Sequence, residues 1–334
     1  MDIIHGIVDR WTFYPAGASL LDLTGKVVIV TGGNTGIGYW TVLHLARKGA
    51  KIYLAARNET KALDAIKSIT EAGIGSGEVI WLPFDLKDPR LAKKAAEDFL
   101  SREKRLDVLI NNAAFLTGPY NADQDGVSEV VMTNHISTFL FTQTLLPLMI
   151  EASKMPDSDV RLVNVASDAH INGPSANPDI RFQSIDDFNG EYKEMFWPDS
   201  GRYGVSKLMN VIYTTELQRR LSTKSIPITC ISLHPGSVDT GRAWRTPYPR
   251  LATIVFKIFF IGPDQRAYTS CFAAASPLIK ADPDKYKGQY IRPVGRIVAK
   301  NPNVAKAGLA EELWETTEKF LRGLGLYTPM SEWL

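Results

Sequence analysis

Short apolar runs alternate with longer stretches of helical spacing along most of the chain between residues 27 and 233. Runs rich in Val and Ile are typical of buried strands, and apolar positions recurring every three to four residues indicate helices. Strands are predicted at Val27–Val30, Lys51–Ala56, Val79–Leu82, Leu106–Ile110, Val160–Val165 and Ile228–Leu233, and helices at Tyr39–Lys48, Thr60–Ala72, Asp88–Ser101, about 126–150 and Arg202–Leu221. This alternation predicts an α/β fold with a doubly wound parallel sheet, helices on both faces, three layers and a single domain.

A glycine-rich turn, Thr31-Gly-Gly-Asn-Thr-Gly-Ile-Gly38, links the first predicted strand to the first predicted helix. Free N–H groups and the positive dipole at a helix N-terminus attract an anion, and glycines let the backbone approach it closely. The turn therefore predicts a phosphate site in a Rossmann-type sheet. Its spacing differs from the usual dinucleotide fingerprint, so a turn that only closes a loop is the alternative. The candidate contacts are Gly32, Asn34, Thr35, Gly36, Ile37 and Gly38.

Residues that follow the next strands extend this site, because ligands of such sheets lie outside the carboxyl ends of the strands. Arg57 follows the second strand, where an arginine would meet the 2′-phosphate of NADP; the alternative is a solvated surface arginine. Asp85, next to Leu86, could accept from an adenine amino group or cap its own loop. After the fourth strand, small residues would let a nicotinamide lie along the backbone, with Asn112, Ala113 and Ala114 as contacts.

A tyrosine and a lysine stand four residues apart at the start of a predicted helix. Tyr203 and Lys207 therefore share a helix face, and Ser167 follows the end of the fifth strand. A tyrosine of ordinary pKa, about 10, is a poor acid or base at neutral pH, but a nearby cation favours the tyrosinate and lowers the pKa. The pair is therefore a candidate general acid/base.

Together with Asn134 and His234-Pro-Gly236, these motifs resemble the short-chain dehydrogenase/reductase family over about residues 25–300. Three segments, Asn134–Phe139, Ser167–His170 and Tyr203–Asn210, resemble more narrowly the branch that holds the retinol dehydrogenases and the WW-domain oxidoreductases. This chain has no WW domain. The resemblance implies an oxidoreductase that transfers a hydride between a nicotinamide cofactor and a carbonyl or alcohol.

The resemblance also implies a role for each matching residue. Tyr203 would protonate the carbonyl oxygen and Ser167 would hydrogen-bond the same oxygen. Lys207 would hold the nicotinamide ribose and lower the Tyr203 pKa, while Asn134 would support a water in the proton relay. The family contacts the nicotinamide carboxamide at positions that match Pro235, Gly236, Val238 and Thr240.

Two departures from the family pattern stand out. Ala114 occupies a position where the family usually has glycine, a change that we expect to be tolerated. The acidic residue that usually follows the second strand is absent, in keeping with NADP(H) as the cofactor.

The chain is expected to divide into an N-terminal extension at 1–24, the dinucleotide-binding domain at 25–300, and a C-terminal helix and tail at 301–334. A long connection at about 173–200 favours a lid over an apolar substrate, with surface packing or a subunit contact as alternatives. Residues 244–262 would form a second wall, and Leu251–Ile261 could instead touch a membrane surface, which we favour less. The aromatic residues of the lid segment are Phe182, Phe188, Tyr192, Phe196 and Trp197.

Composition narrows the class of protein. The 334 residues are 45% hydrophobic, and Lys+Arg 38 nearly balances Asp+Glu 36, so nothing points to nucleic acid. Cys230 and Cys271 lie in apolar surroundings and are expected to be buried free thiols, which fits a reducing cytoplasm. Neither a secretion signal nor a membrane-spanning run is expected. No histidine spacing suggests a metal, and His135 and His170 are expected to be structural.

The sequence therefore predicts an NADP(H)-dependent oxidoreductase of lipophilic aldehydes, ketones or alcohols, such as natural-product intermediates, retinoids or steroids. One alternative is a cofactor-binding sensor or scaffold, and another is a non-redox biosynthetic step, such as an epimerisation or cyclisation, on the same fold. Homo-oligomers through the helices near 126–150 and 202–221 and a monomer both stay open.

Overall fold

An eight-stranded sheet runs through the computed structural model, which describes residues 19–236 and 262–327. The strand order is β3-β2-β1-β4-β5-β6-β7-β8; neighbours are parallel up to β7, and β8 is antiparallel to β7. The strands are β1 (Val27–Thr31), β2 (Lys51–Ala56), β3 (Glu78–Pro83), β4 (Val108–Asn111), β5 (Val160–Val165), β6 (Ile228–Leu233), β7 (Tyr290–Arg292) and β8 (Arg296–Ile297). The order reverses between β1 and β4, which is where doubly wound sheets bind ligands.

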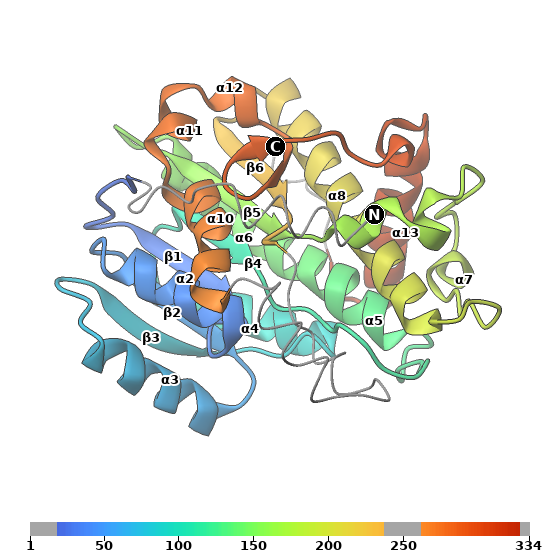
Figure 1. The fold of residues 1–334 in the computed structure, drawn as a ribbon, viewed down its shortest axis with the longest axis horizontal. Helices are drawn as coiled ribbons and strands as arrows, with labels where there is room; N and C mark the ends of the chain where they lie inside the picture. The colour runs from blue at the N-terminus through green and yellow to red at the C-terminus, as the bar shows by residue number, and fades with distance from the viewer. Residues whose placement is uncertain (1–18, 237–261, 328–334) are drawn as a thin grey trace.

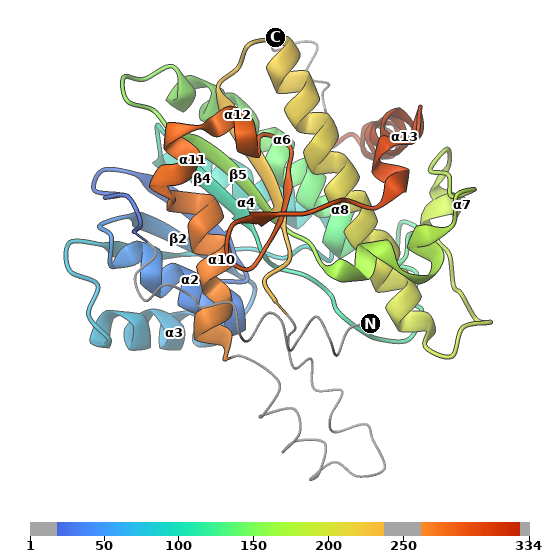
Figure 2. The ribbon, with the colours of Figure 1, turned by 45° about the horizontal axis from the view of Figure 1, so that its top comes forward.

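Helices cover both faces of the sheet (Figures 1 and 2). One layer is formed by α4 (Pro89–Arg102), α6 (Ser137–Ser153) and α8 (Pro198–Thr223), and the other by α2 (Gly36–Ala46), α3 (Glu59–Glu71) and α10 (Pro263–Ala275). Alternate residues of β1 enter the two cores: Ile29 packs with the α4, α6 and α8 layer, and Val28 with the α2, α3 and α10 layer. The predicted three-layer fold is thus confirmed.

The remaining elements lie in the connections and after β6. They are α5 (Glu129–Val131), η1 (Met132–Ile136), η2 (Asp168–Ile171), η3 (Gly173–Ala176), α7 (Ile185–Phe188), α11 (Pro277–Ala281), α12 (Pro283–Tyr286), η5 (Pro302–Ala305) and α13 (Leu309–Gly323). Every strand expected from the sequence is present, whereas β7, β8 and α10 to α12 were not predicted. The helix expected at about 126–150 begins at Glu129 and passes through η1, a π-helical turn, before α6.

Helix α13 packs on the outer side of α6 and α8 and closes that core. The Trp314 ring lies 5.0 Å from that of Phe139 on α6 and 5.7 Å from that of Tyr213 on α8, measured between ring centroids. The Arg220 guanidinium stacks 4.1 Å from the centre of the Trp314 ring. The outer faces of the two long helices are therefore covered by the chain itself in this region.

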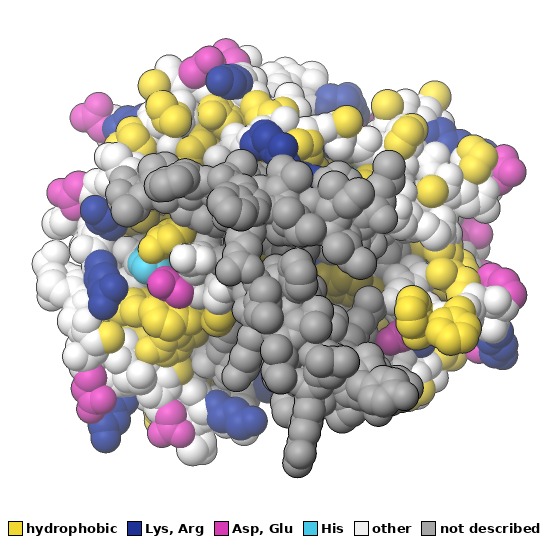
Figure 3. All heavy atoms as spheres, in the orientation of Figure 1, with side chains coloured by type: hydrophobic (Ala, Val, Ile, Leu, Met, Phe, Trp, Pro, Cys, Tyr) yellow, Lys and Arg dark blue, Asp and Glu magenta, His cyan; other side chains and the backbone are white. Residues whose placement is uncertain are grey.

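The described surface carries mixed charge. On the face in Figure 3, basic and acidic side chains are interspersed among the described residues. Cys230 and Cys271 are buried and free, as expected, and burial raises the pKa of both thiols. None of the helices within residues 19–236 and 262–327 combines the length and the apolar character that crossing a membrane requires.

Candidate active site

The glycine-rich turn lies at the carboxyl end of β1 and opens directly into α2. Gly32 and Gly36 have φ angles of 65° and 54°, in the left-handed region that favours glycine. A Cβ on Gly38 would lie 2.2 Å from the main-chain oxygen of Gly32, so this position admits no side chain. A Cβ on Gly36 would meet no atom within 4 Å. The turn therefore packs closely on itself at Gly38 and leaves open space at Gly36.

The N-terminus of α2 is suited to binding an anion. Thr35 is its N-cap residue and makes no side-chain capping hydrogen bond, and no acidic side chain stands in the first turn. The first N–H groups of a helix have no partner within the helix. The open space at Gly36 and these uncapped donors fit a phosphate group of a dinucleotide.

Asn112 and Thr31 hold the glycine turn against the end of β4. The Asn112 Nδ2 donates to the main-chain oxygen of Thr31 at 2.8 Å. The Thr31 Oγ1 accepts from the main-chain N–H groups of Asn112 and Ala113, both at 2.9 Å. The Asn112 side chain thus supports the turn, and the backbone of Ala113 lies beside Gly32. The sequence predicted Asn112 and Ala113 as cofactor contacts. It gave no indication that the Thr31 hydroxyl joins these two residues to the glycine turn.

The residues after β2 and β3 take different roles. Arg57 is exposed directly after β2. Asp85 accepts from the main-chain N–H of Lys87 at 3.0 Å, which is the loop-capping alternative for this carboxylate. Leu86 is buried in the core. The cap uses one oxygen of Asp85 and leaves its other oxygen for a ligand.

Tyr203 and Lys207 share one face of α8, as their spacing predicted. The Lys207 Nζ lies 5.5 Å from the centre of the half-buried Tyr203 ring. Lys207 itself is buried, and its Nζ donates to the main-chain oxygen of Val165 at 2.8 Å. Burial lowers the pKa of Lys207 to about 7. Lys207 therefore gains or loses its charge near neutral pH.

Ser167 caps the short helix η2 that follows β5. Its Oγ accepts from the main-chain N–H of Ala169 at 3.2 Å. This bond fixes the hydroxyl oxygen and leaves its hydrogen free to donate to a substrate oxygen. The geometry is compatible with the carbonyl-binding role that the resemblance implied.

Asn134 lies in the π-helical turn η1, and its side chain is almost fully committed to the protein. Its Oδ1 accepts from the Phe115 N–H at 2.7 Å, and its Nδ2 donates to the Phe115 oxygen and the Ser206 Oγ, both at 2.9 Å. The Ser206 Oγ in turn donates to the main-chain oxygen of Tyr203 at 2.8 Å. Asn134 therefore connects the loop after β4 to the helix that carries Tyr203, a link that no sequence motif indicated.

The turn after β6 brings further predicted contacts to the same edge of the sheet. His234, which precedes Pro235 and Gly236, donates its main-chain N–H to Ile291 of β7 at 2.9 Å. Gly236 has a φ of 101°, which explains the glycine. Val238 and Thr240, the predicted wall at 244–262 and the run Leu251–Ile261 lie outside the described residues, except for Gly262.

The two suspected structural histidines are both buried. The His135 Nε2 lies 2.9 Å from the Thr317 Oγ1 of α13, and burial lowers its pKa to about 3. The His170 Nδ1 lies 2.7 Å from the main-chain oxygen of Ser167, so this histidine belongs to the loop that carries the serine. Within residues 19–236 and 262–327, no group of three or more His, Cys, Asp or Glu side chains is placed to hold a metal ion.

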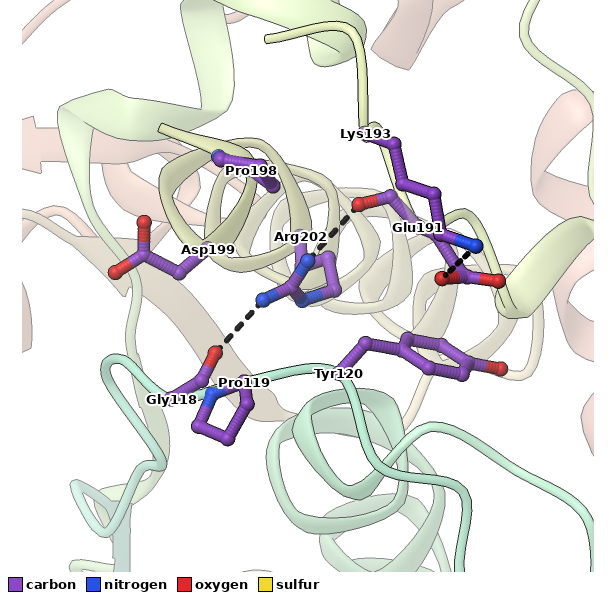
Figure 4. Close-up of a pocket in the computed structure, with 8 residues that line it drawn as sticks. All are labelled: Gly118, Pro119, Tyr120, Glu191, Lys193, Pro198, Asp199 and Arg202. Carbon is purple, nitrogen blue, oxygen red and sulfur yellow. Dashed lines mark hydrogen bonds and ion pairs between the residues drawn. The ribbon is translucent and has the colours of Figure 1, made fainter. Parts of the chain in front are cut away.

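A pocket of about 480 Å³ lies beside the N-terminal turn of α8 (Figure 4). Arg202, directly before Tyr203, donates to the main-chain oxygens of Glu191 at 2.9 Å and Gly118 at 2.7 Å and so joins two walls of the pocket. The pocket is lined by Gly118, Pro119, Tyr120, Glu191, Lys193, Pro198, Asp199 and Arg202. Its rim is charged rather than purely apolar, which the aromatic lid sequence did not indicate.

The aromatic residues expected to form a lid have three different environments. Phe182 and Phe188 are buried in the main core, so they are unavailable to a substrate. Tyr192 is half-buried. Phe196 and Trp197 are 88% and 64% exposed and pack against each other with ring centroids 5.0 Å apart. Only part of the predicted lid can therefore face a ligand.

Comparisons with known proteins show relatives of this chain in sequence and in fold. Residues 26–178 match the family model of the short chain dehydrogenases. A short-chain dehydrogenase/reductase of Armillaria gallica is 46% identical over 308 residues, covering 91% of this chain and 95% of that protein. Human retinol dehydrogenase 11 is 37% identical over 256 residues, covering 77% and 74%. The crystal structure of an uncharacterised protein from Mycobacterium paratuberculosis has a TM-score of 0.65 at 28% identity, covering 91% and 96%.

The fold and the relatives together define a nicotinamide-dependent oxidoreductase of CH–OH and C=O groups. The chain belongs to the short-chain dehydrogenase/reductase family, in its retinol dehydrogenase-like branch. Members of this family use NAD or NADP as the cofactor and small molecules as substrates.

Proposed function

We propose that this protein is an NADP(H)-dependent reductase of lipophilic aldehydes or ketones, or the dehydrogenase of the corresponding alcohols. The observation that carries the proposal is the placement of Tyr203 beside buried Lys207 on α8, next to the segment of Ser167 after β5. The same arrangement would serve both directions, because a tyrosine that donates a proton in reduction accepts one in oxidation.

The chain's own residues supply the proton and orient the carbonyl. The Tyr203 phenol donates its proton to the carbonyl oxygen, and the Ser167 hydroxyl donates a hydrogen bond to the same oxygen, which stabilises the developing alkoxide. When it is protonated, Lys207 favours the tyrosinate that remains. The bound nicotinamide would supply or accept the hydride. Asn134 joins the loop after β4 to helix α8 and so holds both in place around these groups.

Preference for NADP(H) is supported by Arg57. An exposed guanidinium directly after β2 is suited to the 2′-phosphate, and Ala56 before it leaves no carboxylate to bind the ribose hydroxyls of NAD. The open, uncapped start of α2 would receive the pyrophosphate.

A lipophilic substrate is supported by two observations. The name of the human relative specifies retinol, a lipophilic alcohol, as the substrate of that protein. In this chain, Phe196 and Trp197 expose large apolar surfaces directly before Pro198 of the charged pocket. A substrate with a long apolar body and a polar group would match both features.

The test is oxidation of NADPH with a panel of lipophilic aldehydes and ketones, with NADH in parallel. We expect turnover with NADPH, and a loss on the order of 100-fold or more in kcat for Tyr203→Phe. Tyr53→Phe is the matched control, because the Tyr53 hydroxyl bonds Glu103 at 2.7 Å at the opposite end of the sheet.

Two outcomes would overturn the proposal. Tight NADPH binding without turnover of any carbonyl would favour the sensor or scaffold. The second outcome is a product that never contains the deuterium supplied at the C4 position of NADPH. It would favour a non-redox step.

A further inference from the structure

Asp168, which directly follows the serine of the candidate site, joins three separate segments with its carboxylate. Its Oδ1 accepts a hydrogen bond of 2.9 Å from the Tyr290 hydroxyl. Its Oδ2 lies 2.6 Å from the Arg292 Nη2 and 3.5 Å from the His234 Nε2. Tyr290 and Arg292 belong to β7, and His234 begins the turn after β6. One side chain therefore links the ends of β5, β6 and β7.

The charge in this cluster is carried by Asp168 and Arg292. Burial is the main cause that lowers the pKa of His234 to about 4, against an opposing contribution from Asp168. His234 is therefore neutral at pH 7, and its contact with Asp168 is not an ion pair. The Arg292 side chain is 11% exposed, so its pair with Asp168 is largely shielded from water.

The same segment is held from its other side by His170 and Asn301. The His170 Nδ1 lies 2.7 Å from the Ser167 oxygen, and the Asn301 Nδ2 donates to the His170 oxygen at 2.5 Å. The His170 ring also packs edge-on against that of Tyr290, with centroids 4.5 Å apart. The segment that carries Ser167 therefore has two sets of contacts, and Tyr290 takes part in both.

We propose that Asp168 is a positioning residue: through Tyr290 and Arg292 it fixes the η2 turn so that the Ser167 hydroxyl meets the substrate oxygen. Through His234 it also sets the distance between that turn and the Pro235–Gly236 turn. Neither function requires Asp168 to touch a substrate or cofactor. The proposal rests on the proposed function for its catalytic readout, because an error of about 1 Å at a reacting group costs on the order of 100-fold in rate.

A double-mutant cycle tests this coupling. We expect Asp168→Asn to lower kcat by about 10-fold to 100-fold while the Kd for NADPH changes by less than about threefold. In a Ser167→Ala background the same substitution should have little further effect, because the group that it positions is gone. Tyr290→Phe removes the hydroxyl that donates to Asp168 and should also lower kcat. An equal fold-loss in both serine backgrounds, or no loss in kcat, would overturn the proposal.

Hydrogen exchange supplies a readout that does not depend on turnover. The amides of Ala169 and His170 should exchange several-fold faster in Asp168→Asn than in the wild type. The control is Asp98→Asn, since Asp98 pairs with Arg102 on the exposed surface of α4 at 2.6 Å. If the wild type turns over no carbonyl, the proposed function fails and exchange alone decides: faster exchange at these amides supports the positioning role, and unchanged exchange overturns it.

Discussion

The Lys207 Nζ donates a 2.8 Å hydrogen bond to the main-chain oxygen of Val165, the last residue of β5. Ser167 follows two residues later, so one bond joins the helix that carries Tyr203 to the strand end that carries the serine. Lys207 is buried, and its pKa falls to about 7 because the charged form is poorly solvated there.

The lowered pKa predicts a pH-dependent stability that Lys207→Met would remove. Between about pH 7 and pH 10.5 the unfolded chain binds the lysine proton and the folded chain does not, so wild-type stability rises with pH through this window. The free energy of unfolding of the wild type minus that of Lys207→Met should increase by up to about 1.4 kcal/mol per pH unit. Urea denaturation without cofactor at pH 7, 8 and 9 measures this difference.

The control for this measurement is Lys67→Met, because the Lys67 side chain is 77% exposed. Its difference from the wild type should stay flat over the same range of pH. A flat difference for Lys207→Met as well would show that the buried lysine keeps an ordinary pKa in the folded protein.

Gly36→Ala separates cofactor binding from backbone strain. Gly36 and Gly73 both have positive φ, 54° and 81°, and a Cβ on either would meet no atom within 4 Å. Both alanine variants should therefore lose a similar stability, on the order of 1 kcal/mol. Only the methyl on Gly36 would occupy the space proposed for the phosphate, so we expect the Kd for NADPH to rise about 10-fold or more in that variant. Fluorescence titration and thermal unfolding provide the two readouts; equal NADPH affinities in the two variants would argue against a phosphate at this turn.

Arg57→Ala tests the choice between NADPH and NADH. Loss of a guanidinium that binds the 2′-phosphate should raise KM for NADPH by about 10-fold, a change in binding of about 1.4 kcal/mol. KM for NADH should change by less than about twofold, because NADH has no phosphate there. Lys61→Ala, an exposed cation on α3, is the control for general surface charge. A similar rise in KM for both cofactors would contradict the assignment.

The parts of this protein that sequence could predict are those fixed by local periodicity. Buried strands such as the one predicted at Val27–Val30 are recognised by a continuous apolar run, and Tyr203 and Lys207 by their helical spacing. The link made by Asn134 escaped prediction because two of its three hydrogen bonds go to the main chain of Phe115, and residue type does not reveal a main-chain partner. The Asp168 cluster escaped because Tyr290 is 122 positions away in the chain.

The burial of two aromatic residues in the predicted lid segment also escaped the sequence. Phe182 and Phe188 look like substrate-facing aromatics when only their segment is considered, because the long connection between Ser167 and Tyr203 shows no extended apolar periodicity that would predict their burial. Both are buried in a core that also contains residues of α13, more than 100 positions later, and the Thr316 Oγ1 of that helix donates to the Phe182 oxygen at 2.7 Å. Long-range packing of this kind decides burial and is invisible to local periodicity.

Trp314 is predicted to be the main attachment of α13 to the rest of the domain. It packs on Phe139 and Tyr213, lies under the Arg220 guanidinium, and donates from Nε1 to Glu318 at 2.7 Å. Trp314→Ala should lower the free energy of unfolding by about 3–5 kcal/mol, because it leaves a cavity that rigid neighbours cannot fill.

Trp197→Ala is the control: it makes the same chemical change at a side chain that is 64% exposed, and it should change the free energy of unfolding by no more than about 0.5 kcal/mol. Urea denaturation of both variants measures the contrast, and size-exclusion chromatography shows whether the loosened α13 exposes the apolar faces of α6 and α8 to a second copy. Equal stabilities of the two variants would mean that α13 is held by contacts other than this ring.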